Sequence, residues 1–317
     1  MTRGHALVVL VACVPPPRAP VAYYEPARPP APAIDMTRAG VVVERHAEFA
    51  FSGGRIELEL RRDGDHLYEI ARDRYAVGVV IEWELADVAS AGVVALAPTA
   101  GIARLPPAPT PDGEGAAVVL TQLQLAAPDG RYRPPVVTVH ARFGDPLARP
   151  RPYAYRLPYA RGTTFAVLQG FHGAFSHRGS NEYAVDFDCP VATPVLAARP
   201  GIVVASFDGA QGSGTTPEFR EYGRANFVLV LHDDGTLGEY MHLAPSGVKV
   251  APGDRVARGD PLALSGNTGF STTPHLHFQV MTAGEDGRSA RSFPFQLAVA
   301  PDRVEEPVQG RAYPSWE

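Results

Sequence analysis

The chain has 317 residues, of which 45% are hydrophobic and 20% charged, and its formal net charge is −5 with a pI near 6.1. This composition is ordinary for a globular protein, and the length favours two domains with short extensions. A negative net charge without a long run of Lys or Arg excludes the basic surface that nucleic acid binding requires. The 31 Gly and 32 Pro favour turns over long helices, and therefore β structure.

Residues 1–13 have the layout of a signal peptide, because Arg3 precedes an apolar run that is too short to span a bilayer. The run ends in Leu10-Val11-Ala12-Cys13, which resembles a bacterial lipobox. That resemblance implies that the protein is exported to the periplasm or cell envelope, where a lipidated Cys13 anchors it to a membrane. An ordinary secretory leader or a misassigned start codon is the alternative. We expect Cys13 and the other cysteine, Cys189, to be unpaired.

Two regions follow before the middle of the chain. Residues 14–38 are rich in Pro and Ala and predict an extended linker. Residues 39–157 contain short runs of strand character, at 40–44, 55–60 and 117–120, separated by turn residues. Residues 56–60 alternate apolar and charged side chains, which is typical of a strand with one face in water. We predict a β-sandwich-like accessory domain without a catalytic cluster, whose role is structural, spacing or substrate docking.

Residues 158–300 predict a second domain of short strands and tight turns, and residues 301–317 a tail that runs over the surface. Residues 226–232 and 236–243 flank Asp233-Asp234-Gly235, which is typical of a β-hairpin. No segment of this half has the length and periodicity of a long helix. The overall expectation is therefore an all-β protein.

Histidines cluster in the second half, where six of the ten lie between residues 172 and 277. In a strand, His275, His277 and Gln279 would share one face while the apolar residues between them enter the core. His177 and Asp186 add a third imidazole and a carboxylate. Two His and one Asp make a three-ligand set with an open position, as in catalytic zinc sites. A His-Glu-x-x-His helix, the commonest zinc peptidase motif, is absent from the sequence.

Residues 165–282 resemble the lysostaphin-type (LytM-like, M23) metallopeptidase family, over more than a third of the chain. The resemblance rests on the motifs around His177 and Asp186 and on residues 193–201, 240–243, 250–254, 266–269 and 274–278. It implies an antiparallel β-sheet domain that hydrolyses peptidoglycan peptides. It also implies one zinc ion held by His177, Asp186 and His277, with His242 and His275 as catalytic residues beside the open coordination position.

The sequence departs from the family pattern in two places. Typical members have the Asp four residues after the first His, whereas His177 and Asp186 are nine apart, which leaves His172 as an alternative ligand. Phe171 stands where some relatives carry a Tyr. Glu182 as a general base, Cys189 as a ligand and His232 as a site residue are weaker alternatives, and we expect His232 to be structural.

These patterns predict a zinc metalloendopeptidase that cuts the stem-peptide cross-links of bacterial peptidoglycan, and nothing in them requires more than a monomer. The alternative is a non-catalytic protein of the same fold that regulates cell-wall amidases. Such proteins usually lack ligands, whereas all five His and Asp positions are filled here.

Overall fold

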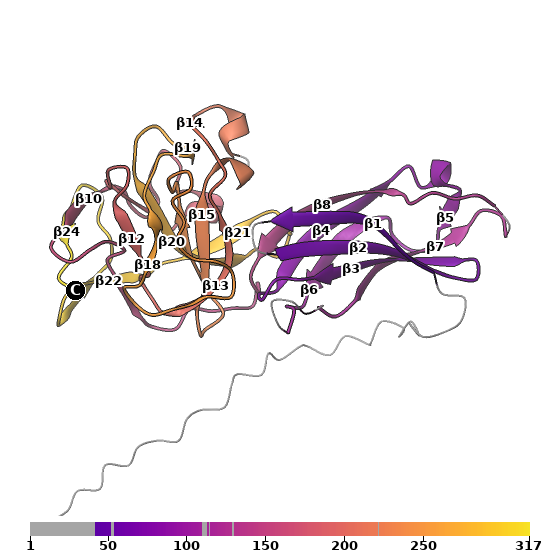
Figure 1. The fold of residues 1–317 in the computed structure, drawn as a ribbon, viewed down its shortest axis with the longest axis horizontal. Coiled ribbons are helices and arrows are strands. Elements are labelled where there is room, and N and C mark those ends of the chain that lie inside the picture. The colour runs from indigo at the N-terminus through magenta and orange to yellow at the C-terminus, as the bar shows by residue number, and fades with distance from the viewer. Residues whose placement is uncertain (1–41, 52–53, 110–112, 114, 129, 221) are drawn as a thin grey trace, which may run out of the picture. The chain divides into compact units, whose positions relative to one another are not determined.

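The structure is a computed structural model that describes residues 42–317, apart from residues 52–53, 110–112, 114, 129 and 221 (Figure 1). The predicted leader with Cys13 (1–13) and the linker (14–38) lie outside the described residues. All described residues belong to one compact unit, Met36–Glu317, whose regular elements are β-strands and a few short 3₁₀ turns. The predicted all-β fold is confirmed. Among the described residues, no helix is long and apolar enough to cross a bilayer.

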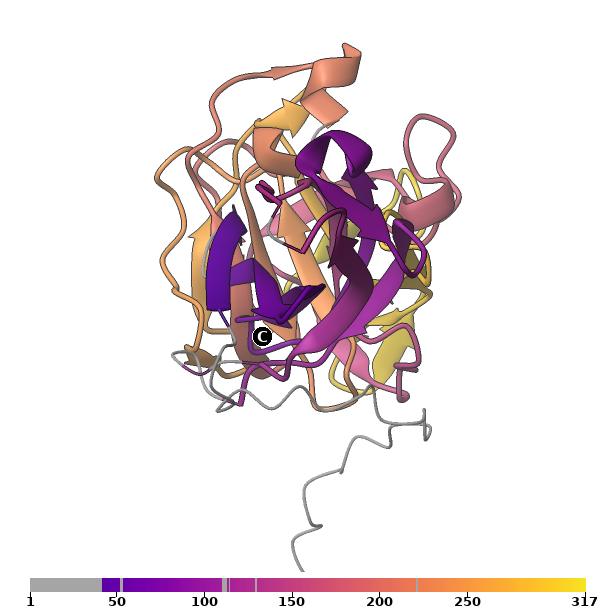
Figure 2. The same ribbon diagram turned by 90° about the vertical axis from the view of Figure 1, so that its right-hand side faces the viewer.

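The first strands form two antiparallel sheets, whose indigo and purple ribbons face the viewer in Figure 2. The five-stranded sheet has the order β1 (Val42–Phe51), β2 (Gly54–Asp63), β3 (His66–Asp73), β7 (Val118–Leu125), β5 (Val93–Ala95). The other sheet has the order β6 (Ala100–Leu105), β4 (Val79–Ala86), β8 (Val136–Phe143), and one 3₁₀ turn, η1, covers Ala89–Ala91. Side chains of both sheets, such as Leu58 and Ile81, share one buried cluster, as in a β-sandwich.

The charged face of β2 was predicted to lie in water, and this prediction is wrong. Glu57 is 0% and Glu59 8% exposed. Arg74 Nε lies 2.8 Å from Glu57 Oε2, and Arg61 Nη2 lies 2.5 Å from Glu59 Oε2. Alternation in a strand shows which side chains share a face, whereas burial of the charged face depends on ion-pair partners that alternation cannot reveal.

Asp73, at the end of β3, leads to a prediction about stability. The side chain is fully buried, Oδ1 accepts the Tyr75 N–H at 2.7 Å, and Oδ2 has no hydrogen-bond partner among the described residues. Burial raises the pKa of Asp73 to about 8, although the Tyr75 hydrogen bond opposes the change. The folded state therefore binds this proton more tightly than the unfolded state. The resulting stabilisation is complete below pH 4 and is lost as pH rises through 8, by at most about 1.4 kcal/mol per pH unit.

We expect Asp73→Asn to remove this pH dependence, because Asn cannot ionise but retains the oxygen that accepts the Tyr75 N–H. Urea unfolding at pH 5 and pH 8.5 measures the effect, with Asp302→Asn at an exposed position as the control. Parallel stability profiles for wild type and Asp73→Asn would contradict the prediction.

The second half of the chain is built on a nine-stranded antiparallel sheet. Its strands, in spatial order, are β17 (Arg255–Val256), β13 (Gly201–Phe207), β15 (Phe227–Leu231), β16 (Leu237–Met241), β20 (Leu276–Ala283), β11 (Val185–Phe187), β10 (Thr164–Gln169) and β24 (Ala312–Pro314), and β21 (Ala290–Phe293) pairs with β20. The expected surface tail thus contributes β24, in which Tyr313 is only 1% exposed.

Short strands and 3₁₀ turns complete this half. The small sheets are β12 (Pro194–Leu196) with β18 (Pro261–Leu264), the parallel pair β14 (Ser213–Gly214) and β19 (Gly269–Phe270), and β23 (Arg303–Glu305), β22 (Gln296–Ala300) and β9 (Ala154–Arg156), of which β22 and β9 are parallel. The 3₁₀ turns are η2 (Gly179–Asn181), η3 (Pro217–Arg220) and η4 (Tyr222–Arg224). The predicted domain boundary at 157/158 stays a prediction.

The predicted hairpin joins β15 to β16. The His232 N–H donates to Thr236 O at 2.8 Å, and Gly235 has a φ of +81°, in the region that glycine adopts without strain. Asp234 Oδ1 accepts the Thr236 hydroxyl at 2.6 Å, which further fixes the turn. The turn sets the register in which Val228 of β15 lies opposite Tyr240 of β16.

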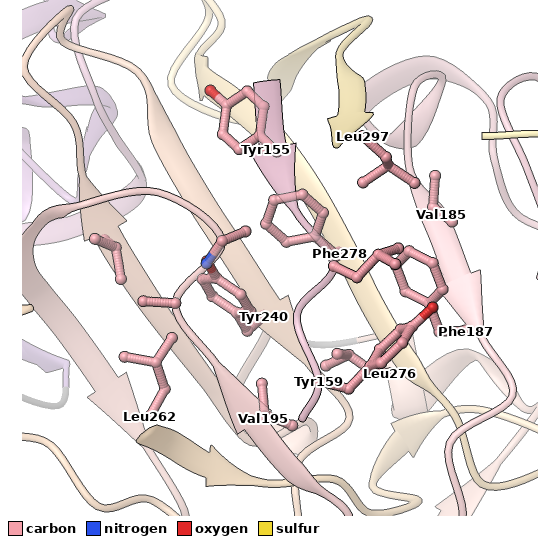
Figure 3. Close-up of a cluster of buried hydrophobic side chains, with 14 of the residues drawn as sticks. Tyr155, Tyr159, Val185, Phe187, Val195, Tyr240, Leu262, Leu276, Phe278 and Leu297 are labelled. Carbon is pink, nitrogen blue, oxygen red and sulfur yellow. The ribbon is translucent and has the colours of Figure 1, made fainter. Parts of the chain in front are cut away.

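The core under this sheet explains the alternation in β20. Leu276, Phe278 and Val280 enter one buried cluster, in which the rings of Phe278 and Tyr240 are 5.0 Å apart between centroids (Figure 3). Burying one such side chain contributes about 1.5–3 kcal/mol. His277 and Gln279 must then lie on the opposite face of the strand, because side chains alternate along it.

Candidate metal centre

The structure brings all five predicted site residues together at one end of the central strands. Asp186 of β11 and His277 of β20 are register partners, and His277 is also the partner of Met241, the residue before His242. His275 immediately precedes β20 and is held by an isolated bridge to Gly266. His177 comes from the loop between β10 and β11. Neighbouring strands in one sheet therefore bring together residues that are far apart in the chain.

The three predicted metal ligands are close enough to bind one ion. His177 Nε2 lies 3.1 Å from Asp186 Oδ2, and His277 Nδ1 lies 2.9 Å from Asp186 Oδ1. One ligand atom from each of the three residues lies within 4.8 Å of the others. The exposed fractions are 0% for His177, 7% for Asp186 and 4% for His277. This is a buried group with one oxygen and two nitrogen donors.

The hydrogen bonds of His177 show that this group fits a cation. His177 Nδ1 donates to Gly170 O at 2.8 Å, which leaves the lone pair on Nε2. Among the described residues this buried Nε2 has no hydrogen-bond partner, and it faces a carboxylate oxygen. A cation between two facing lone pairs would satisfy both. Two imidazoles and one carboxylate suit Zn²⁺, and three protein ligands leave a fourth position open.

His242 and His275 lie beside the three predicted ligands, and each holds Nδ1 on a backbone carbonyl. His242 Nδ1 donates to Thr268 O at 2.7 Å, and His275 Nδ1 donates to Thr273 O at 2.8 Å. The two ring centroids are 4.6 Å apart, and His275 Nε2 lies 3.6 Å from Asp186 Oδ1. His242 has a φ of +62°, an uncommon conformation for a residue with a side chain and one that is often found at functional sites.

Burial and neighbouring charges determine the protonation of this group. Burial opposes ionisation of Asp186, but the close contacts with His177 and His277 outweigh it and hold the pKa of Asp186 well below its usual range. Burial lowers the pKa of His277, but Asp186 more than offsets this and the pKa is raised. Burial, helped by His275 and His277, lowers the pKa of His242 to about 3. His242 is therefore neutral near pH 7, with a nitrogen that can accept a proton.

A cleft of about 230 Å³ adjoins the cluster, and His242 and His277 line it together with Ser176 and Phe270. Phe175, which is 58% exposed, stacks on Phe270 with 5.7 Å between ring centroids. The cluster is therefore reachable from solvent, and an aromatic pair lies beside it.

The alternative residues lie elsewhere or have other partners. The side chain of His172 is 60% exposed and pairs with Glu182 at 3.3 Å, so the geometry favours His177. His232 is buried against Pro200 O at 2.9 Å, which is a structural contact. Cys189 is a buried free thiol, and Phe171 packs against Tyr183 and Phe295.

Sequence reasoning missed two buried polar residues near the ligands, Gln169 and Glu239. Gln169 Nε2 donates to Asp186 Oδ2 at 3.1 Å. Glu239 Oε2 accepts a hydrogen bond at 2.5 Å from Nε2 of Gln279, which follows His277 by two residues in β20. Register could have indicated Glu239, since it lies opposite Gln279 in the predicted hairpin strand. No spacing pattern marks Gln169, because its partner Asp186 is 17 residues away.

Comparison with known proteins finds a family match over part of the chain. Residues 180–289 match peptidase family M23, and the match includes Asp186, His242, His275 and His277. The chain carries an M23 domain. This confirms the resemblance that the sequence motifs indicated.

Relatives of the M23 domain include cell-wall enzymes. The chain is 41% identical over 114 residues to glycyl-glycine endopeptidase ALE-1 of Staphylococcus capitis, covering 36% of this chain and 28% of that protein. It is 33% identical over 99 residues to peptidoglycan DD-endopeptidase ShyA of Vibrio cholerae, covering 31% and 20%. The chain thus spans less than a third of these relatives. The solved catalytic domain of lysostaphin from Staphylococcus simulans is 28% identical, with a TM-score of 0.29, over 41% of this chain and 87% of that one.

Proposed function

We propose that this chain is a zinc metalloendopeptidase that hydrolyses peptide cross-links of bacterial peptidoglycan. The observation that carries the proposal is the buried set of His177, Asp186 and His277, with the rings of His242 and His275 beside it. The substrate class is supported by M23 relatives whose names are glycyl-glycine endopeptidase and peptidoglycan DD-endopeptidase.

Each residue has a chemical task in this proposal. His177 Nε2, His277 Nδ1 and one oxygen of Asp186 would hold the metal. Bound there, zinc would polarise the scissile carbonyl and acidify water at neutral pH. His242 and His275 accept a proton from the attacking water and return one to the leaving amine, because both donate the Nδ1 hydrogen to a backbone carbonyl and therefore carry the lone pair on Nε2.

The proposal extends to the location of the protein. A substrate in the cell wall requires export, for which the layout of residues 1–13 is suited. Lipidation of Cys13 would keep the domain at a membrane while the linker of residues 14–38 gives it reach.

Digestion of purified peptidoglycan tests the proposed function. Zinc-loaded protein, chelated protein and chelated protein with zinc restored are compared by chromatography and mass analysis of the products. We expect cross-linked dimers to become monomers only when zinc is present, and the masses of the products identify the bond. Protein that binds zinc, releases nothing and stimulates a cell-wall amidase would instead establish the regulator.

A further inference from the structure

Gln169 is the last residue of β10, and its side chain contacts Asp186 and the turn that precedes His177. It is 7% exposed and is the register partner of Asp186 on β11. The next residue, Gly170, accepts the Nδ1 hydrogen of His177. One short stretch of backbone thus reaches both Asp186 and His177.

The carboxamide of Gln169 uses its full hydrogen-bonding capacity. Nε2 donates to Asp186 Oδ2 at 3.1 Å and to Ser176 Oγ at 2.8 Å. Oε1 accepts the backbone N–H groups of Phe175 at 2.9 Å and Ser176 at 3.1 Å. Two donors and two acceptor sites are all that an amide offers. Exchanging N and O would place oxygen against a carboxylate and N–H against N–H, so the network fixes the orientation of the amide.

The turn that precedes His177 is shaped around this side chain. A Cβ at Gly173 would lie only 2.0 Å from Gln169 Cγ, so the backbone passes directly over Gln169. The His177 N–H donates to Gly173 O at 3.1 Å, which closes the turn of residues 173–177. The position of His177 therefore depends on a turn in which the N–H groups of Phe175 and Ser176 both donate to Gln169 Oε1.

We propose that Gln169 is a positioning residue for the metal, which holds Asp186 and the turn of residues 173–177 in the metal-binding arrangement. Its donor side orients the Asp186 carboxylate, and its acceptor side orients the turn that carries His177. The inference rests on the proposed function only in taking zinc as the metal. Loss of a hydrogen-bond partner of a metal ligand typically weakens metal binding about 10–100-fold.

Zinc affinity of the full chain, measured by competition with a chelator and without substrate, is the test. Gln169→Met has a similar length but no polar atoms, and Gln169→Asn has the same amide on a stem too short to reach both partners. We expect both variants to bind zinc about 10–100-fold more weakly than wild type. The matched control is Gln296→Met, at an exposed position of β22, which should bind zinc as wild type does.

Hydrogen exchange in the metal-free protein gives a second measurement. The amides of Phe175 and Ser176 should exchange faster in both Gln169 variants, since they lose their acceptor, whereas thermal unfolding of the metal-free protein reports whether the fold is intact. A folded Gln169→Met that binds zinc with wild-type affinity overturns the inference. If Gln169→Met does not fold, the same outcome with Gln169→Asn decides. Wild-type protein that binds zinc but cleaves no peptidoglycan would overturn the proposed function and leave this inference standing.

Discussion

Asp186→Ala is expected to abolish both zinc binding and peptidoglycan cleavage. Asp186 is the only carboxylate in the set, and its oxygens lie within 3.6 Å of ring nitrogens of His177, His275 and His277. Without Asp186, two neutral imidazoles would be the remaining ligands of a buried divalent cation, and neither offsets its charge. The loss of zinc affinity should exceed the 10–100-fold typical of a lost partner of a ligand. Chelator competition and peptidoglycan digestion on the same preparation measure both effects.

Asp188→Ala is the matched control, because Asp188 is the same residue type two positions further along and is exposed. It should retain zinc and activity. Zinc-dependent cleavage by Asp186→Ala at a rate near that of wild type would refute the assignment of Asp186 as a ligand.

His242→Ala and His275→Ala are expected to keep zinc but lower kcat about 10²–10⁴-fold, the usual contribution of a positioned acid or base. Neither residue belongs to the group whose ligand atoms lie within 4.8 Å of one another. In both, Nε2 carries the lone pair, since each Nδ1 donates to a backbone carbonyl. Chelator competition should give wild-type zinc affinity, and steady-state kinetics on a cross-linked dimer should show the fall in kcat.

His172→Ala serves as the control for these two variants. Its ring is 60% exposed and pairs with Glu182, so removal should change neither zinc binding nor rate. Loss of zinc in His242→Ala would make His242 a ligand, and an unchanged rate in His275→Ala would remove that residue from the mechanism.

Local patterns predicted much of the second half. Alternation placed His277 and Gln279 opposite Leu276 and Phe278, because a strand with one face in a core has only two sides. The Asp-Asp-Gly turn predicted the hairpin that carries His242 to the site. The spacing of His177 and Asp186 mattered less than their proximity, since the loop between β10 and β11 absorbs the extra residues.

Contacts between distant segments could not be predicted in this way. The alternating pattern predicted that Glu57 and Glu59 lie in water, whereas the structure buries both against arginines. The arginine that pairs with Glu57 is Arg74, 17 residues further along the chain. The last residues read as a surface tail because Pro and charged residues dominate them, yet Tyr313 adds a strand to β10. Gln169 carries no motif, and its importance arises only when a turn folds over it.

The three backbone carbonyls that hold His177, His242 and His275 belong to Gly170, Thr268 and Thr273. A main-chain oxygen is present whatever side chain stands at its position, so no substitution can delete these acceptors. The loops can therefore change in sequence through evolution, and be redesigned to alter the walls of the cleft, while the imidazoles keep their tautomer and direction. This makes the loop surfaces, rather than the histidines, the natural places to change what the cleft binds.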